Sequence, residues 1–137
     1  MKKKNCTFIN DSKATSFQAT KFALKNTKNI FWILGGLPKT NDQFFLKDIK
    51  KNIIMSYIIG NHKNFFKRKL KNQVNTRISN NLKNALNQAV KDVKILNKEN
   101  STILFSPSSA SFDQFLNFER RGEEFKRLSK YYARKLI

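Results

Sequence analysis

The sequence is poor in the residues that build disulfide frameworks, metal sites and histidine-based catalysis. Its 137 residues include one cysteine, Cys6, and one histidine, His62. A single copy of each excludes a disulfide framework and a Cys/His zinc site within the chain, and it leaves no spare partners for a Ser-His or Cys-His nucleophile. This composition suits a compartment that keeps thiols reduced, so we expect a cytoplasmic protein.

Long apolar runs and phosphate-binding glycine motifs are also absent. The longest apolar segments, 30–34 and 53–59, are far shorter than the roughly 20 residues that a membrane-spanning helix needs. The basic residues at 2–4 are not followed by the apolar stretch of a signal peptide, so we expect no membrane and no export. Neither a Gly-x-x-x-x-Gly-Lys-Ser/Thr P-loop nor a Gly-x-Gly-x-x-Gly motif occurs, so the chain alone lacks both familiar ways of holding a nucleoside triphosphate.

Acidic residues are few, with 9 Asp+Glu against 28 Lys+Arg and a formal net charge of +19. Such a surplus raises nucleic acid as a partner, because phosphate neutralisation supplies most non-specific binding energy. However, the basic residues are spread along the whole chain, and A/T-rich codons favour the abundant Lys, Asn, Ile and Phe together. Mutational bias therefore explains the charge, and we do not expect a nucleic-acid partner. A basic nucleic-acid-binding module that uses the 62–73 segment stays as an alternative.

Hydrophobic residues make up 39% of the chain and include 13 Phe, enough for one core and a single domain over 1–137. Short apolar runs alternate with segments of helical periodicity. We expect strands at 7–9, 30–34, 53–59, 76–79 and 101–105. We expect helices at 16–25, 43–51, 62–73, 81–97 and 112–132. This alternation predicts an α/β fold, with a mostly parallel sheet of about five to six strands and helices on both faces.

Ligands of such sheets collect at the carboxyl ends of the strands, so the loops that follow strands are candidate sites. These loops span 10–15, 35–42, 60–62 and 106–111. In the first loop, Thr15 with Gln18 reads as a capping box, which opens a helix N-terminus toward a bound anion. The alternative is that Asp11, Ser12 and Thr15 only form the turn and the cap.

Two further loops carry candidate residues. Lys39 follows Gly35-Gly36 and could meet a carboxylate or phosphate, although a lone Gly-Gly-x-x-Lys is common in loops. Ser111 with Gln114 reads as a second capping box, at the start of the last expected helix. The alternative there is a serine-rich turn followed by an amphipathic helix whose Phe residues fill the core.

Three segments together resemble one protein family: Asn-Asp-Ser-Lys-Ala-Thr at 10–15, Ile-Leu-Gly-Gly at 33–36, and Ser-Pro-Ser-Ser-Ala-Ser-Phe-Asp-Gln-Phe-Leu-Asn-Phe-Glu-Arg-Arg-Gly-Glu-Glu-Phe at 106–125. Over about 7–128, the chain resembles the C-terminal domain of the UDP-N-acetylmuramoyl-L-alanine:D-glutamate ligases, which are ATP-dependent Mur ligases of peptidoglycan precursor synthesis. The resemblance implies a Rossmann-like domain that receives D-glutamate. The family's UDP-binding domain and central ATPase domain are not matched in this chain.

The resemblance also implies roles for particular residues. It assigns D-glutamate binding to Lys13, Thr15, Lys39, Ser111 and Phe118. It places Asp11 and Lys13 toward the nucleotide. In this family the central ATPase domain holds most of the ATP and Mg²⁺ contacts, and UDP-N-acetylmuramoyl-L-alanine is the substrate to which D-glutamate is added. The resemblance implies that this chain's partner is such a central domain, in cis or as a separate chain. We therefore expect no catalytic residue, metal ligand or cofactor in this chain alone, and no catalysis without that partner.

Two departures from the family pattern are visible. Ser108 and Ser109 stand where the family often has Ala-Cys, a small change that leaves the turn intact. The His-Arg-containing stretch that precedes the first strand in the family is replaced by the lysines at 2–4. A different member of the wider Mur ligase and folylpolyglutamate synthase superfamily is a second alternative.

Overall fold

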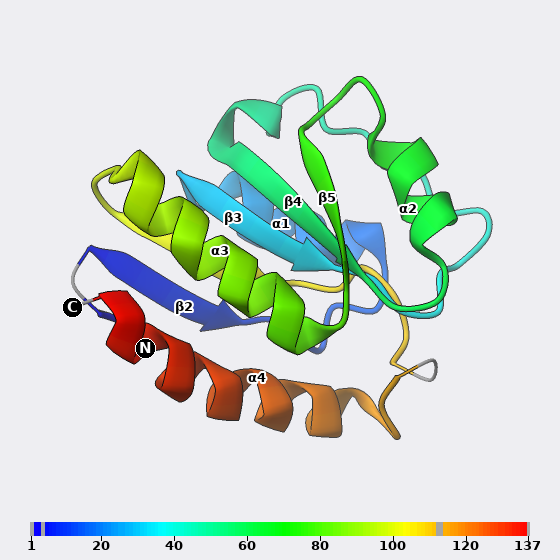
Figure 1. The fold of residues 1–137 in the computed structure, drawn as a ribbon. Helices are drawn as coiled ribbons and strands as arrows, with labels where there is room; N and C mark the ends of the chain where they lie inside the picture. The colour runs from blue at the N-terminus through cyan, green and yellow to red at the C-terminus, as the bar shows by residue number, and fades with distance from the viewer. Residues whose placement is uncertain (1, 4, 112–113, 137) are drawn as a thin grey trace.

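The computed structural model describes residues 2–3, 5–111 and 114–136 (Figure 1). Its centre is a six-stranded sheet in the order β1-β2-β6-β3-β4-β5. The strands are β1 (Lys2–Lys3), β2 (Cys6–Asn10), β3 (Ile30–Leu34), β4 (Ile53–Ile59), β5 (Thr76–Asn80) and β6 (Ser101–Phe105). Strands β2 to β6 are parallel, and only β1 pairs antiparallel, with β2. The predicted mostly parallel α/β sheet is confirmed.

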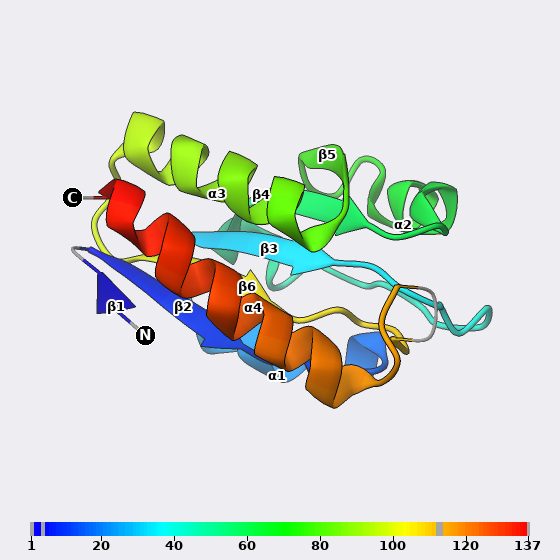
Figure 2. The same ribbon diagram turned by 60° about the horizontal axis from the view of Figure 1, so that its bottom comes forward.

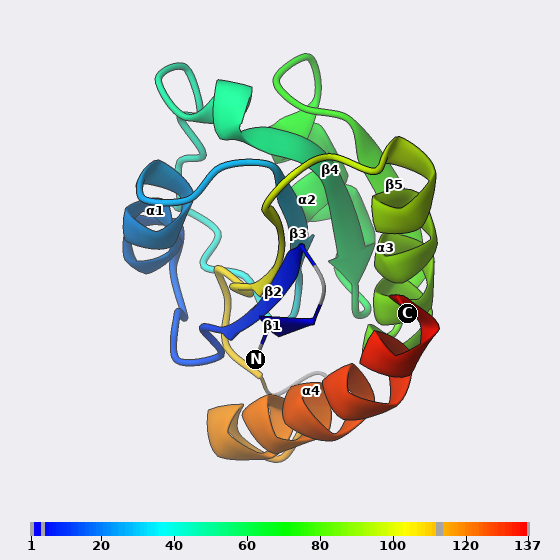
Figure 3. The same cartoon turned by 90° about the vertical axis from the view of Figure 1, so that its left-hand side faces the viewer.

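Helices cover both faces of this sheet. They are α1 (Phe17–Lys25), α2 (Lys63–Leu70), α3 (Leu82–Leu96) and α4 (Phe118–Ala133), with short 3₁₀ turns η1 (Lys50–Asn52) and η2 (Arg134–Leu136). One core cluster joins the sheet to α3 and α4, and the other joins it to α1 and α2. Figure 2 shows α3 and α4 side by side, and Figure 3 shows α1 on the opposite side of the sheet from them.

The central strand β3 shows why its sequence is a continuous apolar run. Phe31 and Ile33 point to the α3 and α4 side, whereas Ile30, Trp32 and Leu34 point to the α1 and α2 side. Because helices cover both faces, no position on this strand meets water, and all five residues are buried.

The expected helix at 43–51 is wrong. This segment is a loop that ends in η1, and its buried residues Phe44, Leu46 and Ile49 do not follow the regular spacing of three and four residues that one face of a helix has. The side chain of Gln73 accepts a hydrogen bond from the Leu46 N–H at 3.0 Å and donates one to the Phe44 carbonyl at 2.8 Å. A distant amide therefore satisfies backbone groups that a helix would have satisfied locally.

Both predicted capping boxes are also wrong. Helix α1 is capped by Ser16, whose side chain accepts from the Ala19 N–H, and not by Thr15. Helix α4 begins at Phe118 with Asn117 as its cap, six residues later than predicted. The carbonyl of Ser111 accepts from the N–H groups of residues 114 and 115 in a separate turn. Positions 112 and 113 of the expected helix lie outside the described residues.

Candidate functional site

Three loops meet at the carboxyl edge of the sheet, where β2, β3 and β6 end; we call 10–15, 35–42 and 106–111 the edge loops. The Asp11 N–H donates to the Phe105 carbonyl at 2.8 Å, at the end of β6. Leu37 and Ala110 exchange two backbone hydrogen bonds, at 2.8 and 3.0 Å. The fourth candidate loop, 60–62, is instead bonded to the end of β5, where the Gly60 N–H donates to the Asn80 carbonyl at 3.0 Å.

A row of hydroxyl groups runs through the interior of this edge to Asp11. The Oγ of Ser108 lies 2.7 Å from Thr20 Oγ1, which lies 2.8 Å from Ser106 Oγ, which lies 2.7 Å from Asp11 Oδ2. Each hydroxyl has one proton to donate, and an ionised carboxylate can only accept. All three contacts are therefore hydrogen bonds if Ser108 donates to Thr20, Thr20 to Ser106, and Ser106 to Asp11. The indole N–H of Trp32 donates to the Ser106 carbonyl at 2.8 Å and fixes the row to β3.

Asp11 is half-buried, and its environment acts on its charge in two opposite ways. Burial raises the pKa of the Asp11 carboxyl above its ordinary value of 3.8, and this effect is the larger. The hydrogen bond from Ser106 lowers the pKa in part, because it favours the charged form. Asp11 is therefore oriented by its own chain before any ligand arrives.

The structure brings some of the predicted site residues together. Lys13 is exposed and Phe118 half-buried, and both line a hollow of about 230 Å³ together with Ser12, Glu119 and Gly122. Ser111 is buried and directly follows the Ala110 pairing with Leu37.

Lys39 and Thr15 are not among the residues that line this hollow. Lys39 is exposed, and within the described part of the chain the structure records no hydrogen bond or ion pair that joins it to the other predicted residues. Thr15 is half-buried just before the α1 cap. Asp42, which sequence reasoning missed, ties the Lys39 loop to α1: its carboxylate accepts from the Phe17 N–H at 2.8 Å. This link joins residues 25 positions apart and has no local sequence signal.

Arg121 is the second residue that sequence reasoning missed. It is 1% exposed, and its guanidinium donates to the Ser12 carbonyl at 2.9 and 3.2 Å and to the Ser109 carbonyl at 2.6 Å. A signal was available, because position 121 lies on the helical stripe of Phe118, Phe125 and Leu128. A charged residue on an apolar stripe needs buried hydrogen-bond acceptors.

Comparisons with known proteins identify the family. No protein-family model matches the chain. The UDP-N-acetylmuramoylalanine–D-glutamate ligase of Rickettsia felis is 39% identical over 132 residues, which is 96% of this chain and 29% of that protein. Ligases of the same name from Nitrobacter hamburgensis and Rickettsia prowazekii are 39% and 40% identical, over 93% and 92% of this chain. The chain belongs to this ligase family.

The match extends over only part of the ligase. The chain spans 27 to 29% of the length of these three relatives, an extent that fits the C-terminal domain alone. The comparisons favour neither the other superfamily members nor a nucleic-acid-binding module.

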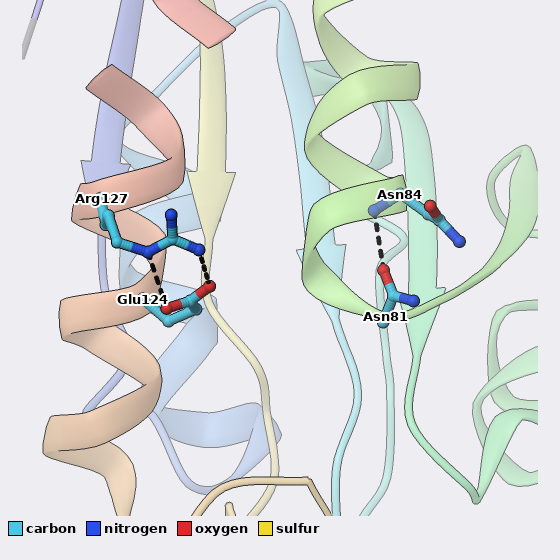
Figure 4. Close-up of polar contacts among 4 residues, drawn as sticks. All are labelled: Asn81, Asn84, Glu124 and Arg127. Carbon is cyan, nitrogen blue, oxygen red and sulfur yellow. Dashed lines mark hydrogen bonds and ion pairs between the residues drawn. The ribbon is translucent and has the colours of Figure 1, made fainter. Parts of the chain in front are cut away.

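A larger groove of this ligase domain, about 690 Å³, lies between the start of α3 and the side of α4. Figure 4 shows Asn81, Glu124 and Arg127, which belong to its two walls. The groove contains none of the predicted D-glutamate residues. Its walls carry both charge signs, and Arg127 donates to the Glu124 carboxylate, which holds the pKa of Glu124 below its ordinary value. On the facing helix, the Asn81 side chain accepts from the Asn84 N–H at 2.8 Å and so caps α3.

Among residues 2–3, 5–111 and 114–136, no three His, Cys, Asp or Glu side chains are grouped as a metal ion would require. No helix in the same ranges is long and apolar enough to cross a membrane.

Proposed function

We propose that this chain is the D-glutamate-binding domain of a cytoplasmic ligase that adds D-glutamate to UDP-N-acetylmuramoyl-L-alanine. The observation that carries the proposal is the convergence of the three edge loops, joined by the Leu37 and Ala110 backbone pair and the Asp11 contact to β6. These loops contain four of the five residues that the family resemblance assigns to D-glutamate, and the fifth, Phe118, begins α4 beside Lys13.

The chemistry of these residues suits a dicarboxylate with one amine. Lys13 and Lys39 supply positive charge, and the hydroxyls of Thr15 and Ser111 supply donors. The N–H of Phe118 lies in the first turn of α4, where backbone amides have no acceptor within the helix. In this proposal the side-chain carboxylate of D-glutamate binds at Ser111 and Phe118, and Lys39 pairs with a carboxylate.

A partner is required for the reaction. The chain has no P-loop, so the central ATPase domain, in cis or as a separate chain, would hold ATP and Mg²⁺, and the family's UDP-binding domain would hold the UDP end of UDP-N-acetylmuramoyl-L-alanine. Asp11 and Lys13 would face the nucleotide across the junction between the two domains. The row of hydroxyls behind Asp11 supports this orientation, because it fixes the carboxylate from within this domain.

Calorimetric titration of the chain with D-glutamate and with L-glutamate tests the proposal. We expect D-glutamate to bind more tightly, and we expect Lys39→Ala and Ser111→Ala to weaken that binding by about tenfold each, as loss of a hydrogen bond to a charged group predicts. Lys71→Ala, an exposed lysine just after α2, is the matched control and should leave binding unchanged. Equal binding of both enantiomers with no effect of either variant would contradict the proposal.

A further inference from the structure

Arg121 lies where helix α4 meets the edge loops. Its guanidinium contacts the first loop through two N–H groups on the Ser12 carbonyl and the last loop through one N–H group on the Ser109 carbonyl. These acceptors are 109 and 12 positions away from it in the sequence. One side chain therefore joins two of the loops that carry the proposed D-glutamate residues.

The remaining edge loop also packs against this arginine. A Cβ atom on Gly36 would lie 3.4 Å from an Arg121 terminal nitrogen and 2.4 Å from the Ala110 carbonyl oxygen. The backbone of the 35–42 loop therefore approaches the 106–111 loop more closely than a side chain at position 36 would allow, and it lies beside the Arg121 guanidinium. Lys39 follows three residues later on the same loop.

Gly122, the next residue of α4, also contacts the first edge loop. A Cβ atom on Gly122 would lie 2.4 Å from Ser12 Oγ, so the helix backbone lies directly against the first loop. The Asn10 side chain accepts from the Ser12 N–H at 3.2 Å and donates to the Gly122 carbonyl at 3.4 Å. The first edge loop therefore packs directly against the backbone of helix α4 at Gly122.

Arginine is suited to this position for a geometric reason. Its planar guanidinium presents several N–H groups in a fixed fork, so two carbonyls bound to it are held at a defined separation. The ammonium of lysine is a single point and would not hold both carbonyls at that separation. Burying a guanidinium is costly unless such acceptors are present, which ties the packing of α4 to the positions of the loops.

We infer that Arg121 is a positioning residue, which sets the relative positions of the three edge loops and thereby the D-glutamate site. This inference rests on the proposed function. It places Arg121 behind the site, acting through Ser12, Ser109 and Gly36, with no direct contact to the amino acid. Replacing the Arg121 guanidinium would therefore change the relative positions of the edge loops while leaving the D-glutamate-binding side chains themselves unchanged.

The test compares Arg121→Met and Arg121→Lys with two controls, Arg120→Met and Leu128→Ala. Arg120 is an exposed neighbour on the same helix, and Leu128→Ala weakens α4 packing without touching the loops. We expect both Arg121 variants to weaken D-glutamate binding by at least about tenfold, with lysine the milder. We expect Leu128→Ala to lower the melting temperature while its D-glutamate affinity stays at the wild-type value. If Arg121→Met fails to fold, Arg121→Lys carries the comparison.

Amide hydrogen exchange supplies a second readout that does not depend on D-glutamate. The Leu37 and Ala110 amides should exchange at least about tenfold faster in the Arg121 variants than in Leu128→Ala at matched stability. If the wild-type chain does not bind D-glutamate, the proposed function fails, and the exchange rates still decide the role of Arg121. Unchanged exchange, or wild-type affinity in both Arg121 variants, would overturn the inference.

Discussion

The hydroxyl of Ser106 donates a 2.7 Å hydrogen bond to the carboxylate of Asp11, although the two residues are 95 positions apart. Ser106 belongs to the loop after β6 and Asp11 to the loop after β2, and these strands are neighbours in the sheet. The bond is the last link of the row that begins at Ser108 and passes through Thr20. The orientation of Asp11 therefore depends on residues from two other segments of the chain, the loop after β6 and helix α1.

Ser106→Ala should destabilise the protein by about 1 to 3 kcal/mol, because it removes the hydrogen bonds that the Ser106 hydroxyl makes with the buried Thr20 and the half-buried Asp11. Urea unfolding measures the change. Ser129→Ala is the matched control, since the buried Ser129 hydroxyl has no hydrogen-bond partner among the described residues, and its effect should stay within about 0.5 kcal/mol. Equal losses in the two variants would show that the row contributes nothing specific.

The raised pKa of Asp11 predicts the sign of one pH effect. The folded protein holds this proton more tightly than the unfolded chain does, so the stability contributed by Asp11 falls as the pH rises from 3.8 through the folded pKa. Asp11→Asn should flatten that part of the stability profile, whereas Ser106→Ala should steepen it by removing the hydrogen bond that lowers the pKa. A carboxyl titration by NMR, with urea unfolding at each pH, checks both; a steeper profile in Asp11→Asn would contradict the assignment.

The caps of α1 give a test of the corrected helix start. Ser16→Ala should cost about 1 kcal/mol of stability, because its side chain satisfies the Ala19 N–H at 3.3 Å. Thr15→Ala should cost less than half of that and should instead weaken D-glutamate binding under the proposed function. Thermal unfolding separates the two variants. A larger stability loss in Thr15→Ala would restore Thr15 as the cap.

The contact between Gly122 and Ser12 predicts a coupled pair. Gly122→Ala should destabilise the protein by about 1 to 3 kcal/mol, because the new Cβ would meet Ser12 Oγ at 2.4 Å. Ser12→Ala removes that oxygen and should recover part of the loss in the double variant. Urea unfolding of all four proteins gives the coupling energy. Strictly additive effects would mean that the helix and the loop are not in contact there.

The single thiol provides a chemical test of the packing of β2. Cys6 is 1% exposed, and burial raises its pKa from the ordinary 9.0 to about 11, because burial disfavours the thiolate. At pH 8 the native protein should therefore react with iodoacetamide much more slowly than the protein unfolded in urea. Equal rates in both conditions would place Cys6 at the surface.

Much of the fold was predictable from the sequence because apolar runs and helical spacing report burial directly. The fully buried run at β3 and the apolar stripe of α3 are examples. The prediction failed at 43–51, where Phe44, Leu46 and Ile49 are buried in a loop and the Gln73 side chain binds the loop backbone from another segment. Strand β1 was also missed, since its pairing of Lys3 with Cys6 has no apolar run to announce it.

The sequence predicted which loops gather at one edge of the sheet, but not the residues that hold these loops in place. Parallel strands bring their following loops to one edge, which placed Asp11, Lys13 and Ser111 in the same region from the alternation alone. The residues behind them, Arg121 and Asp42, act through backbone groups of distant loops. Such contacts depend on three-dimensional packing and leave at most a weak local signal, such as a charge on an apolar stripe.

Backbone amide chemical shifts, followed during titration with D-glutamate, show whether the edge loops form the D-glutamate site. We expect shifts confined to 11–15, 35–42, 106–111 and the first turn of α4, larger with D-glutamate than with L-glutamate. The same titration with a short single-stranded oligonucleotide at physiological salt should leave the spectrum unchanged. Absence of shifts with D-glutamate, or shifts centred on the basic helix α2, would contradict this function.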